Sequence, residues 1–173
     1  MSVDLIVEGQ PGRIHGTLRC GGVTVPCSVG RSGLARDKHE GDGATPVGRF
    51  AIRRLLYRAD RLPKPVTKLP VSEIAQDDGW CDDMAHPQYN QQVKLPFAAS
   101  HEELWRADNL YDLIVVLGHN DTPVIPGLGS AVFLHVRARD GGATAGCVAI
   151  ARDDLLAVLR EVDTGSFIDI RTV

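Results

Sequence analysis

The chain has 173 residues, of which 43% are hydrophobic and 24% charged, and its formal net charge is −3. These values are ordinary for a globular protein, and the length suits a single domain, residues 1–173, with a sizeable core. No run of basic residues occurs, so nucleic acid and anionic membrane are not expected partners. Eighteen glycines and ten prolines favour turns and short strands over long helices.

The first residues, Met1 to Glu8, contain neither a basic segment nor a long apolar core. They therefore predict neither a secretory signal nor a membrane span. If the chain is complete, we expect it to be cytoplasmic or exported by another route.

The first predicted elements are two strands, residues 14–20 and 23–29, joined by a Gly-Gly hairpin signal. This register places Cys27 roughly 13 Å along its strand from the partner of Cys20, at about 3.3 Å per residue. A disulfide tolerates only about 7 Å between Cα atoms, so we expect two free thiols in the core. His15 falls on the opposite, solvated face and is not expected to be catalytic.

The middle of the chain alternates between loops and one strand. A polar, glycine-containing loop over residues 31–46 precedes a predicted strand over 49–57. Residues 59–70 carry three prolines and indicate a surface excursion. Residues 77–89 are irregular but rich in large and polar side chains.

The last third contains the remaining predicted elements. A capping-box pattern predicts a short helix over residues 100–105. Apolar runs predict strands over 113–117 and 131–136. A helix with apolar residues at helical spacing is expected between Asp153 and Gly165, before a last strand over 167–170. The sum is a mainly β domain with two or three short helices.

The most informative motif is the tetrapeptide Thr144-Ala145-Gly146-Cys147, with His135 twelve positions before the cysteine. A thiol after a glycine can sit beside two free backbone amides, and a histidine from a neighbouring strand can take its proton. Acyl transfer through a thioester needs this nucleophile, base and pair of oxyanion donors. The alternative is a buried structural cysteine near an unrelated histidine.

Other segments extend this motif in a recognisable order: Glu40 to Phe50 (EGDGATPVGRF), Trp80-Cys81-Asp82-Asp83, Tyr89-Asn90, Gly129 to His135, and Thr144 to Ile150. Together they resemble the L,D-transpeptidase catalytic-domain (YkuD-type) family. The resemblance extends from about Val3 to Ile170 and implies a YkuD-like β-sandwich. Family members more often carry Ser/Thr-His-Gly-Cys followed by Arg or Asn. Ala145 and Ala149 occupy those positions here, which indicates a branch with Thr-Ala-Gly-Cys.

The resemblance implies peptidoglycan chemistry, and with it a role in cell-wall biogenesis and cell shape. Such enzymes attack the L-centre carbonyl of a diamino acid in a tetrapeptide stem, expel the terminal D-alanine and pass the acyl group to an amine. Cys147 is the expected nucleophile, His135 the base, and the amides of Gly146 and Cys147 the oxyanion donors. We expect His135 to pair with the thiolate as imidazolium, supported by the charges of Arg137 and Arg139. No cofactor is implied.

The candidate substrate-binding residues are Arg137, Thr144, Ala145, His119, Asn120, Tyr89 and Asn90. Five of them have a structural alternative: Arg137 as a solvated loop charge, residues 119–120 as the start of a turn, and residues 89–90 as filling of a loop core. Arg137 would bind stem carboxylates in the functional interpretation.

Two further questions are left open by the residues. Asp82 and Asp83 are candidates to hold the ammonium of an acceptor, or form a turn. The second ring nitrogen of His135 needs an acceptor, either Asp140 or a backbone carbonyl. A metal site is not expected, because the histidines and cysteines lack metal-ligand spacing.

Two rival functions remain. A hydrolytic L,D-carboxypeptidase or amidase would use the same Cys-His pair but pass the acyl group to water, and a non-catalytic peptidoglycan-binding module would form no acyl adduct with a carbapenem. The expected partners are a donor tetrapeptide stem and an acceptor amine, joined in a 3-3 or a 1-3 cross-link. This substrate implies the periplasm or cell envelope, in tension with the N-terminal segment. The oligomeric state cannot be predicted.

Overall fold

A computed structural model describes all residues, 1–173. Its one helix is α1 (Arg152–Glu161). The strands are β1 (Leu5–Gly9), β2 (His15–Cys20), β3 (Val23–Ser28), β4 (Leu34–Ala35), β5 (Thr45–Pro46), β6 (Gly48–Tyr57), β7 (Val71–Glu73), β8 (Asp78–Cys81), β9 (Gln92–Lys94), β10 (His101–Glu103), β11 (Leu113–Leu117), β12 (Phe133–Val136), β13 (Val148–Ile150) and β14 (Phe167–Thr172).

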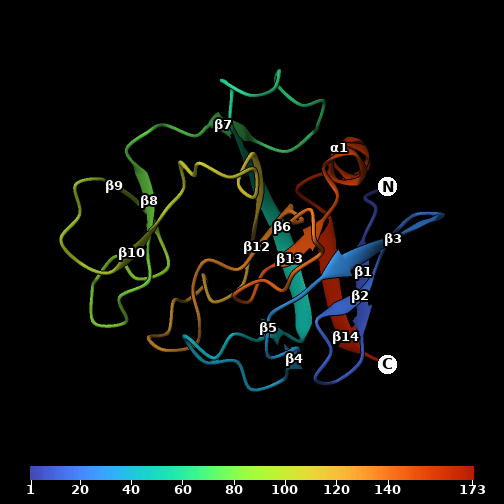
Figure 1. Cartoon of the computed structure of the whole chain (residues 1–173), viewed down its shortest axis with the longest axis horizontal. Coiled ribbons are helices and arrows are strands. Elements are labelled where there is room, and N and C mark those ends of the chain that lie inside the picture. The colour runs from blue at the N-terminus through green and yellow to red at the C-terminus, as the bar shows by residue number, and fades with distance from the viewer.

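The main sheet has nine strands in the order β11-β12-β13-β3-β2-β1-β14-β6-β7, and β6 also pairs with β11 (Figure 1). The long strand β6 makes both connections possible. Its residues 48–51 pair with β14, and its residues 52–57 pair with β11 across a register shift beside Val116 and Leu117. The additional pairing closes eight of the strands into a ring.

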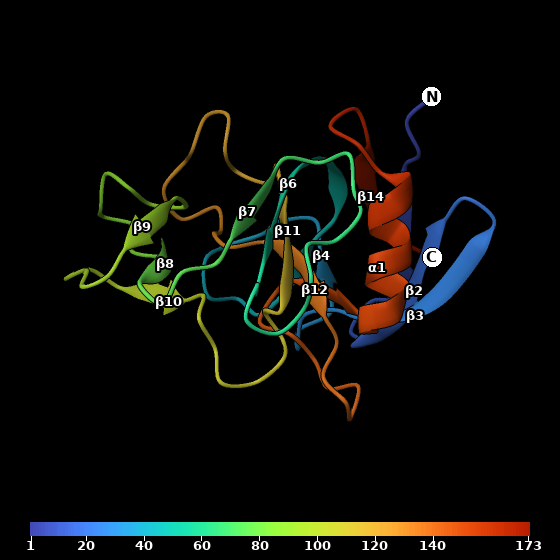
Figure 2. The ribbon, with the colours of Figure 1, turned by 90° about the horizontal axis from the view of Figure 1, so that it is seen from above.

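The interior of this ring is the larger hydrophobic core, a cluster of 25 buried residues. Every strand of the ring contributes alternate side chains to it, as the two-residue period of a strand requires. In β12, Leu134 and Val136 point into this core, so Phe133 and His135 point away from it. The helix adds Leu155 among other residues, and Figure 2 shows α1 alongside the β2–β3 hairpin.

A second, smaller cluster lies on the outer face of β11 and β12, where the small sheet β10-β8-β9 packs. Trp80 and Tyr111 meet the ring of Phe133 edge-to-face, with centroids 5.0 and 5.9 Å apart. Figure 2 shows the small sheet at the end of the molecule remote from α1. Cys147 belongs to this second cluster, so the site forms between the ring and the small sheet.

The mainly β fold and the hairpin register are confirmed. Cys20 pairs with Val23 and Gly16 with Cys27, and all four cysteines are free and buried. The number of helices is corrected to one.

The expected helix over residues 100–105 is wrong, because residues 101–103 form β10 and pair with β8. Its capping-box pattern is a local signal that strand pairing overrides. The real helix begins at Arg152 rather than at the expected cap, Asp153, and no side chain caps it. β12 begins at Phe133, two residues later than expected, because Ala131 has a φ of 52° and cannot continue a strand.

Candidate active site

The site begins with the parallel pairing of β12 and β13, in which His135 lies opposite Ala149. Cys147 directly precedes β13 and shares the outward face of Ala149, because Val148 and Ile150 point into the core. The outward face of β12 carries His135. The sequence elements that flank the two residues therefore bring thiol and imidazole to the same face of neighbouring strands.

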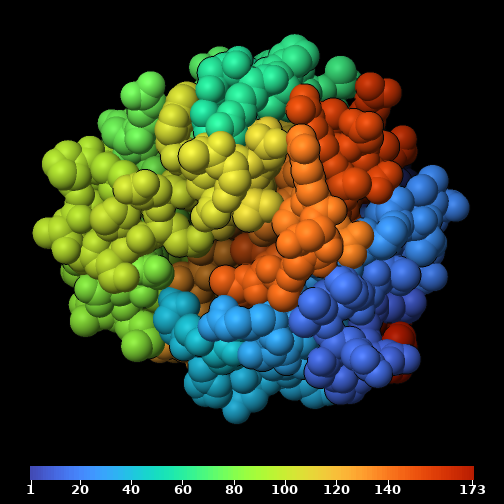
Figure 3. All heavy atoms as spheres, viewed as in Figure 1, coloured from blue at the N-terminus to red at the C-terminus, as the bar shows by residue number.

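Both side chains line one cavity of about 410 Å³. Figure 3 shows it as a hollow bounded by the segments coloured yellow, orange and cyan. Its walls combine the glycine-rich loop, with Lys38 and Glu40, the segment after β10, with Arg106, and the loop that leads to Cys147. Charges of both signs therefore surround a cavity of peptide-binding size.

Cys147 is 6% exposed, and its sulfur is held by two backbone groups. The thiol donates to the carbonyl of Ala131 at 3.2 Å, and the amide of Phe133 donates to the sulfur at 3.4 Å. Burial, chiefly, raises the pKa of the Cys147 thiol to about 12. The thiol of Cys147 is therefore protonated at pH 7.

His135 is held in one orientation by the backbone. Its Nδ1 lies 2.9 Å from the carbonyl oxygen of Val136, which accepts hydrogen bonds only, so we assign the proton to Nδ1 and the free lone pair to Nε2. The ring also meets Tyr111 edge-to-face at 5.3 Å between centroids. Burial lowers the pKa of His135 to about 4, so the imidazole is neutral at pH 7.

These features settle one open question and correct one expectation. The orienting acceptor of His135 is a backbone carbonyl, and the carboxylate of Asp140 instead accepts from the amide of Gly142. Burial shifts both pKa values towards the neutral forms, which argues against the expected thiolate–imidazolium pair in the resting protein. Arg137 does not line the cavity, and its guanidinium donates to the hydroxyl of Ser28 at 2.8 Å.

The two expected oxyanion donors differ in availability. The Gly146 amide donates to the hydroxyl of Thr144 at 3.1 Å, and that hydroxyl donates to the carbonyl of Cys147 at 2.6 Å. Thr45 donates to the same carbonyl at 3.1 Å. The Cys147 amide has no partner, so it is the backbone donor that is free for a substrate oxygen.

The seven candidate substrate-binding residues divide into two groups. Thr144 and Ala145 line the cavity beside Cys147. The others lie outside its lining and are Arg137, His119, Asn120, Tyr89 and Asn90.

Asn90 connects three segments behind the cavity. Its side-chain oxygen accepts from the indole of Trp80 and from the amide of Ala131, each at 3.0 Å. Its amide group donates to the carbonyls of His119 and Asn120, at 3.1 and 2.8 Å. Asn90 thus fixes Ala131, whose carbonyl receives the thiol of Cys147.

Tyr89 and His119 also pack behind the cavity wall. The Tyr89 hydroxyl donates to Glu40 at 2.9 Å and accepts from the amide of Gly129 at 3.0 Å. The ring of His119 meets Phe50 edge-to-face at 5.2 Å, and its Nδ1 has no hydrogen-bond partner. Burial lowers the pKa of His119 to about 4, so this ring is also neutral at pH 7.

Sequence reasoning missed several residues of the lining, of which Lys38, Glu102 and Tyr111 are the most notable. The Tyr111 hydroxyl donates to the Glu102 carboxylate at 2.8 Å, and burial raises the pKa of both groups. Glu102 was missed because a helix was expected over residues 100–105, whereas Lys38 lies two residues before the motif that begins at Glu40. Asp82 lines the cavity as well, and its Oδ1 is buried without a hydrogen-bond partner.

Two further features bear on the kind of protein. No three or more His, Cys, Asp or Glu side chains are grouped so that they could hold a metal ion. The single helix, with ten residues, is too short to cross a membrane.

Comparison with known proteins identifies the family of this chain. Residues 17–170 match the family model described as the L,D-transpeptidase catalytic domain, YkuD, and the chain belongs to this family. No curated protein matches the chain.

Two solved structures are similar. An L,D-transpeptidase from Mycobacterium smegmatis is 14% identical, with a TM-score of 0.44 over 98% of this chain and 59% of that chain. L,D-transpeptidase 1 from Mycobacterium tuberculosis is 13% identical, with a TM-score of 0.40 over 99% of this chain and 63% of that one. The chain thus spans about three fifths of the length of these structures.

Proposed function

We propose that this protein is a cysteine L,D-transpeptidase that acts on peptidoglycan tetrapeptide stems through a thioester at Cys147. The observation that carries the proposal is the placement of Cys147 and His135 on one face of two paired strands, where both line the same cavity. The family membership of residues 17–170 supports the same reaction class.

In the first half-reaction, the Cys147 sulfur attacks the carbonyl carbon of the stem while its proton moves to Nε2 of His135. The C–S bond forms as the carbonyl becomes an oxyanion, and the free Cys147 amide donates to that oxygen. The oxyanion then collapses, the C–N bond to D-alanine breaks, and Nε2 returns the proton to the leaving amine. The products are a thioester and free D-alanine.

In the second half-reaction, an acceptor amine attacks the thioester carbonyl and gives its proton to Nε2. The C–S bond breaks, and the thiolate takes the proton back from the imidazolium. Atoms and charges balance without a cofactor. An amine from a second stem gives a cross-link, of the 3-3 or the 1-3 type, and a free D-amino acid gives an exchanged stem.

The resting pair starts these steps in its neutral form. A His135 pKa of about 4 leaves Nε2 unprotonated at pH 7, which is the form that accepts a proton. The buried thiol avoids ionising until a substrate carbonyl is in place. General base catalysis of this kind contributes typically 10²–10⁴-fold, and a single oxyanion donor about 3–4 kcal/mol.

The test is incubation with a disaccharide-tetrapeptide, followed by mass spectrometry of the muropeptides. The expected products are cross-linked dimers, and Cys147→Ala is expected to abolish them while remaining folded. Cys20→Ala is the matched control, because this buried cysteine lies outside the cavity, and it should retain dimer formation. Dimers that persist in Cys147→Ala would contradict the proposal.

The same assay separates the rival functions. Free D-amino acid in the reaction gives an exchanged stem if an amine accepts the acyl group, whereas trimmed stems alone indicate a carboxypeptidase. A binding module without catalysis would yield no carbapenem adduct at Cys147. The muropeptide profile distinguishes the 3-3 from the 1-3 linkage. The substrate places the proposed site of action at the cell envelope, which fractionation of cells would test.

A further inference from the structure

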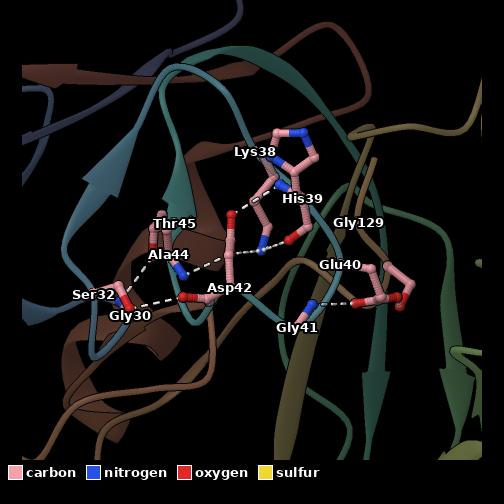
Figure 4. Close-up of polar contacts among 12 residues, drawn as sticks. Gly30, Ser32, Lys38, His39, Glu40, Gly41, Asp42, Ala44, Thr45 and Gly129 are labelled. Atoms are coloured by element: carbon pink, nitrogen blue, oxygen red, sulfur yellow. Dashed lines mark hydrogen bonds and ion pairs between the residues drawn. The ribbon is translucent and has the colours of Figure 1, made fainter. Parts of the chain in front are cut away.

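The glycine-rich loop over residues 38–44 is organised around one carboxylate. Asp42 accepts hydrogen bonds from the backbone amides of His39 and Ala44, each at 2.8 Å, and from the ammonium of Lys38 (Figure 4). These contacts, chiefly with the amide of His39, lower the pKa of Asp42 despite its partial burial. The carboxylate therefore fixes the position of the Lys38 ammonium.

Lys38 is a nearly buried cation that lines the cavity with Cys147. Its side chain is only 8% exposed. The ammonium has three N–H donors, and the protein satisfies two, through Asp42 and through the carbonyl of His39 at 3.1 Å. The third has no protein acceptor. A desolvated ammonium with a free donor favours an anionic ligand, because charge-assisted hydrogen bonds are the strong ones.

The position of Lys38 relative to the nucleophile defines what it can reach. Its Nζ lies 3.5 Å from the point where a Cβ on Gly146 would sit, and Gly146 directly precedes Cys147. Arg31 lines the same wall of the cavity. The carboxylates of Asp42 and Glu40 balance these two cations, so an anion would be bound here by the free donor of the Lys38 ammonium, beside the place where a stem would be attacked.

A stem attacked at Cys147 carries an anion close to its scissile bond. The carboxylate of the leaving residue lies only an amide nitrogen and a Cα beyond the reacting carbonyl carbon, within about 4–5 Å at ordinary bond lengths. The free Cys147 amide serves the carbonyl oxygen itself. The ammonium one residue further along the wall therefore matches the terminal carboxylate rather than the oxyanion.

We propose that Lys38, held by Asp42, binds the C-terminal carboxylate of the donor stem and thereby selects stems that end in a free carboxylate. The inference rests on the proposed function and adds to it the residue that recognises the leaving end. Loss of a hydrogen bond to a charged group costs about 1.5–3 kcal/mol, which corresponds to roughly 10- to 150-fold in kcat/KM.

The experiment compares two donors that differ in one group: the stem with C-terminal D-alanine and the same stem with D-alaninamide. Release of D-alanine or D-alaninamide is measured at a fixed, saturating acceptor stem. We expect the unmodified protein to prefer the acid by roughly 10- to 150-fold in kcat/KM. Lys38→Gln should lose this preference, mainly through a raised KM for the acid, so that the ratio of the two kcat/KM values falls towards one.

The ratio of the two kcat/KM values does not depend on how much of a variant folds. Lys38→Arg, which retains the charge, should restore part of the preference, and Lys64→Gln, at an exposed site outside the cavity, should leave it unchanged. Equal losses for both donors in Lys38→Gln would show a purely structural role and overturn the inference. Turnover by the unmodified protein without an acid preference would also overturn it and leave the proposed function intact. Turnover of neither donor would contradict both this inference and the proposed function.

Discussion

Burial sets the resting state of Cys147 and His135. With pKa values near 12 and 4, neither group is charged between about pH 5 and pH 11. A substrate carbonyl and the free Cys147 amide therefore have to stabilise the charge that develops during attack. In the proposed reaction, the geometry that controls this amide is consequently as important as the side chains of Cys147 and His135.

Gly146→Ala tests that geometry. Gly146 has a φ of 144°, and a Cβ there would lie 3.0 Å from the carbonyl oxygen of Ala44. Alanine would shift the backbone at the nucleophile, so we expect a loss of carbapenem acylation of at least about tenfold and about 1–3 kcal/mol of stability. Mass spectrometry of the adduct and denaturant unfolding measure the two effects. Gly22→Ala, where a Cβ meets nothing within 4 Å, is the control. Unchanged acylation in Gly146→Ala would contradict the assigned role of this backbone.

The placement of Cys147 and His135 at one cavity could be predicted from sequence, because a glycine-preceded thiol and a histidine ending an apolar run are chemically distinctive. The hydrogen bond from the Gly146 amide to the Thr144 hydroxyl could not be predicted, since it depends on one side-chain rotamer. Nor could the neutral resting pair be predicted. Cys147 is buried in a cluster that also contains Tyr111 and Trp80, which are distant in sequence.

At the scale of elements, strand pairing determines the secondary structure of segments whose local sequence pattern is misleading. The Ser100 capping box indicates a helix, but pairing of residues 101–103 with β8 makes β10. The apolar run over 131–136 indicates a strand of six residues, but the backbone of Ala131 turns to a positive φ. That turn persists because Asn90 binds the Ala131 amide, a contact between segments 41 residues apart.

Asn90→Ala tests this support for β12. The substitution leaves the Trp80 indole and the Ala131 amide without their acceptor in a buried region, so we expect about 2–4 kcal/mol of destabilisation and reduced acylation of Cys147. Urea unfolding and carbapenem labelling measure these effects.

Asn90 itself has a φ of 57°, so backbone strain has to be separated from lost hydrogen bonds. Asn90→Gly relieves the strain and removes the same side chain. If the hydrogen bonds matter, the glycine variant is destabilised as well. A glycine variant as stable as the unmodified protein would assign the whole effect to the backbone.

At the scale of the molecule, the sequence predicted six of the eight ring strands but neither β1 nor β13, and it left most of the strand neighbours open. The ring closes through β1 with β14, from opposite ends of the chain, and through β6 with β11. Only the β2–β3 hairpin pairs through a turn that the sequence marks. A hairpin register follows from its turn residues, whereas long-range pairings depend on which apolar faces fill a shared core.

Because the folded protein buries two neutral imidazoles, we expect its free energy of unfolding to decrease at acid pH. The folded pKa values of His135 and His119 are about 4, against 6.5 ordinarily, because burial disfavours the charged ring. The unfolded chain therefore binds protons first as the pH falls. The contribution of each ring is fully present above about pH 6.5 and is lost as the pH falls towards 4.

His135→Gln removes one of the two rings that make the stability depend on pH. Between pH 7 and pH 4.5 the unmodified protein should lose about 2 kcal/mol more of its unfolding free energy than the variant does. Urea unfolding at both pH values measures the difference, in which the contributions of carboxylates and other histidines cancel. Parallel pH profiles would mean that the ring takes up a proton as readily in the folded protein as in the unfolded chain. That result would contradict the neutral His135 ring on which the proposed first half-reaction depends.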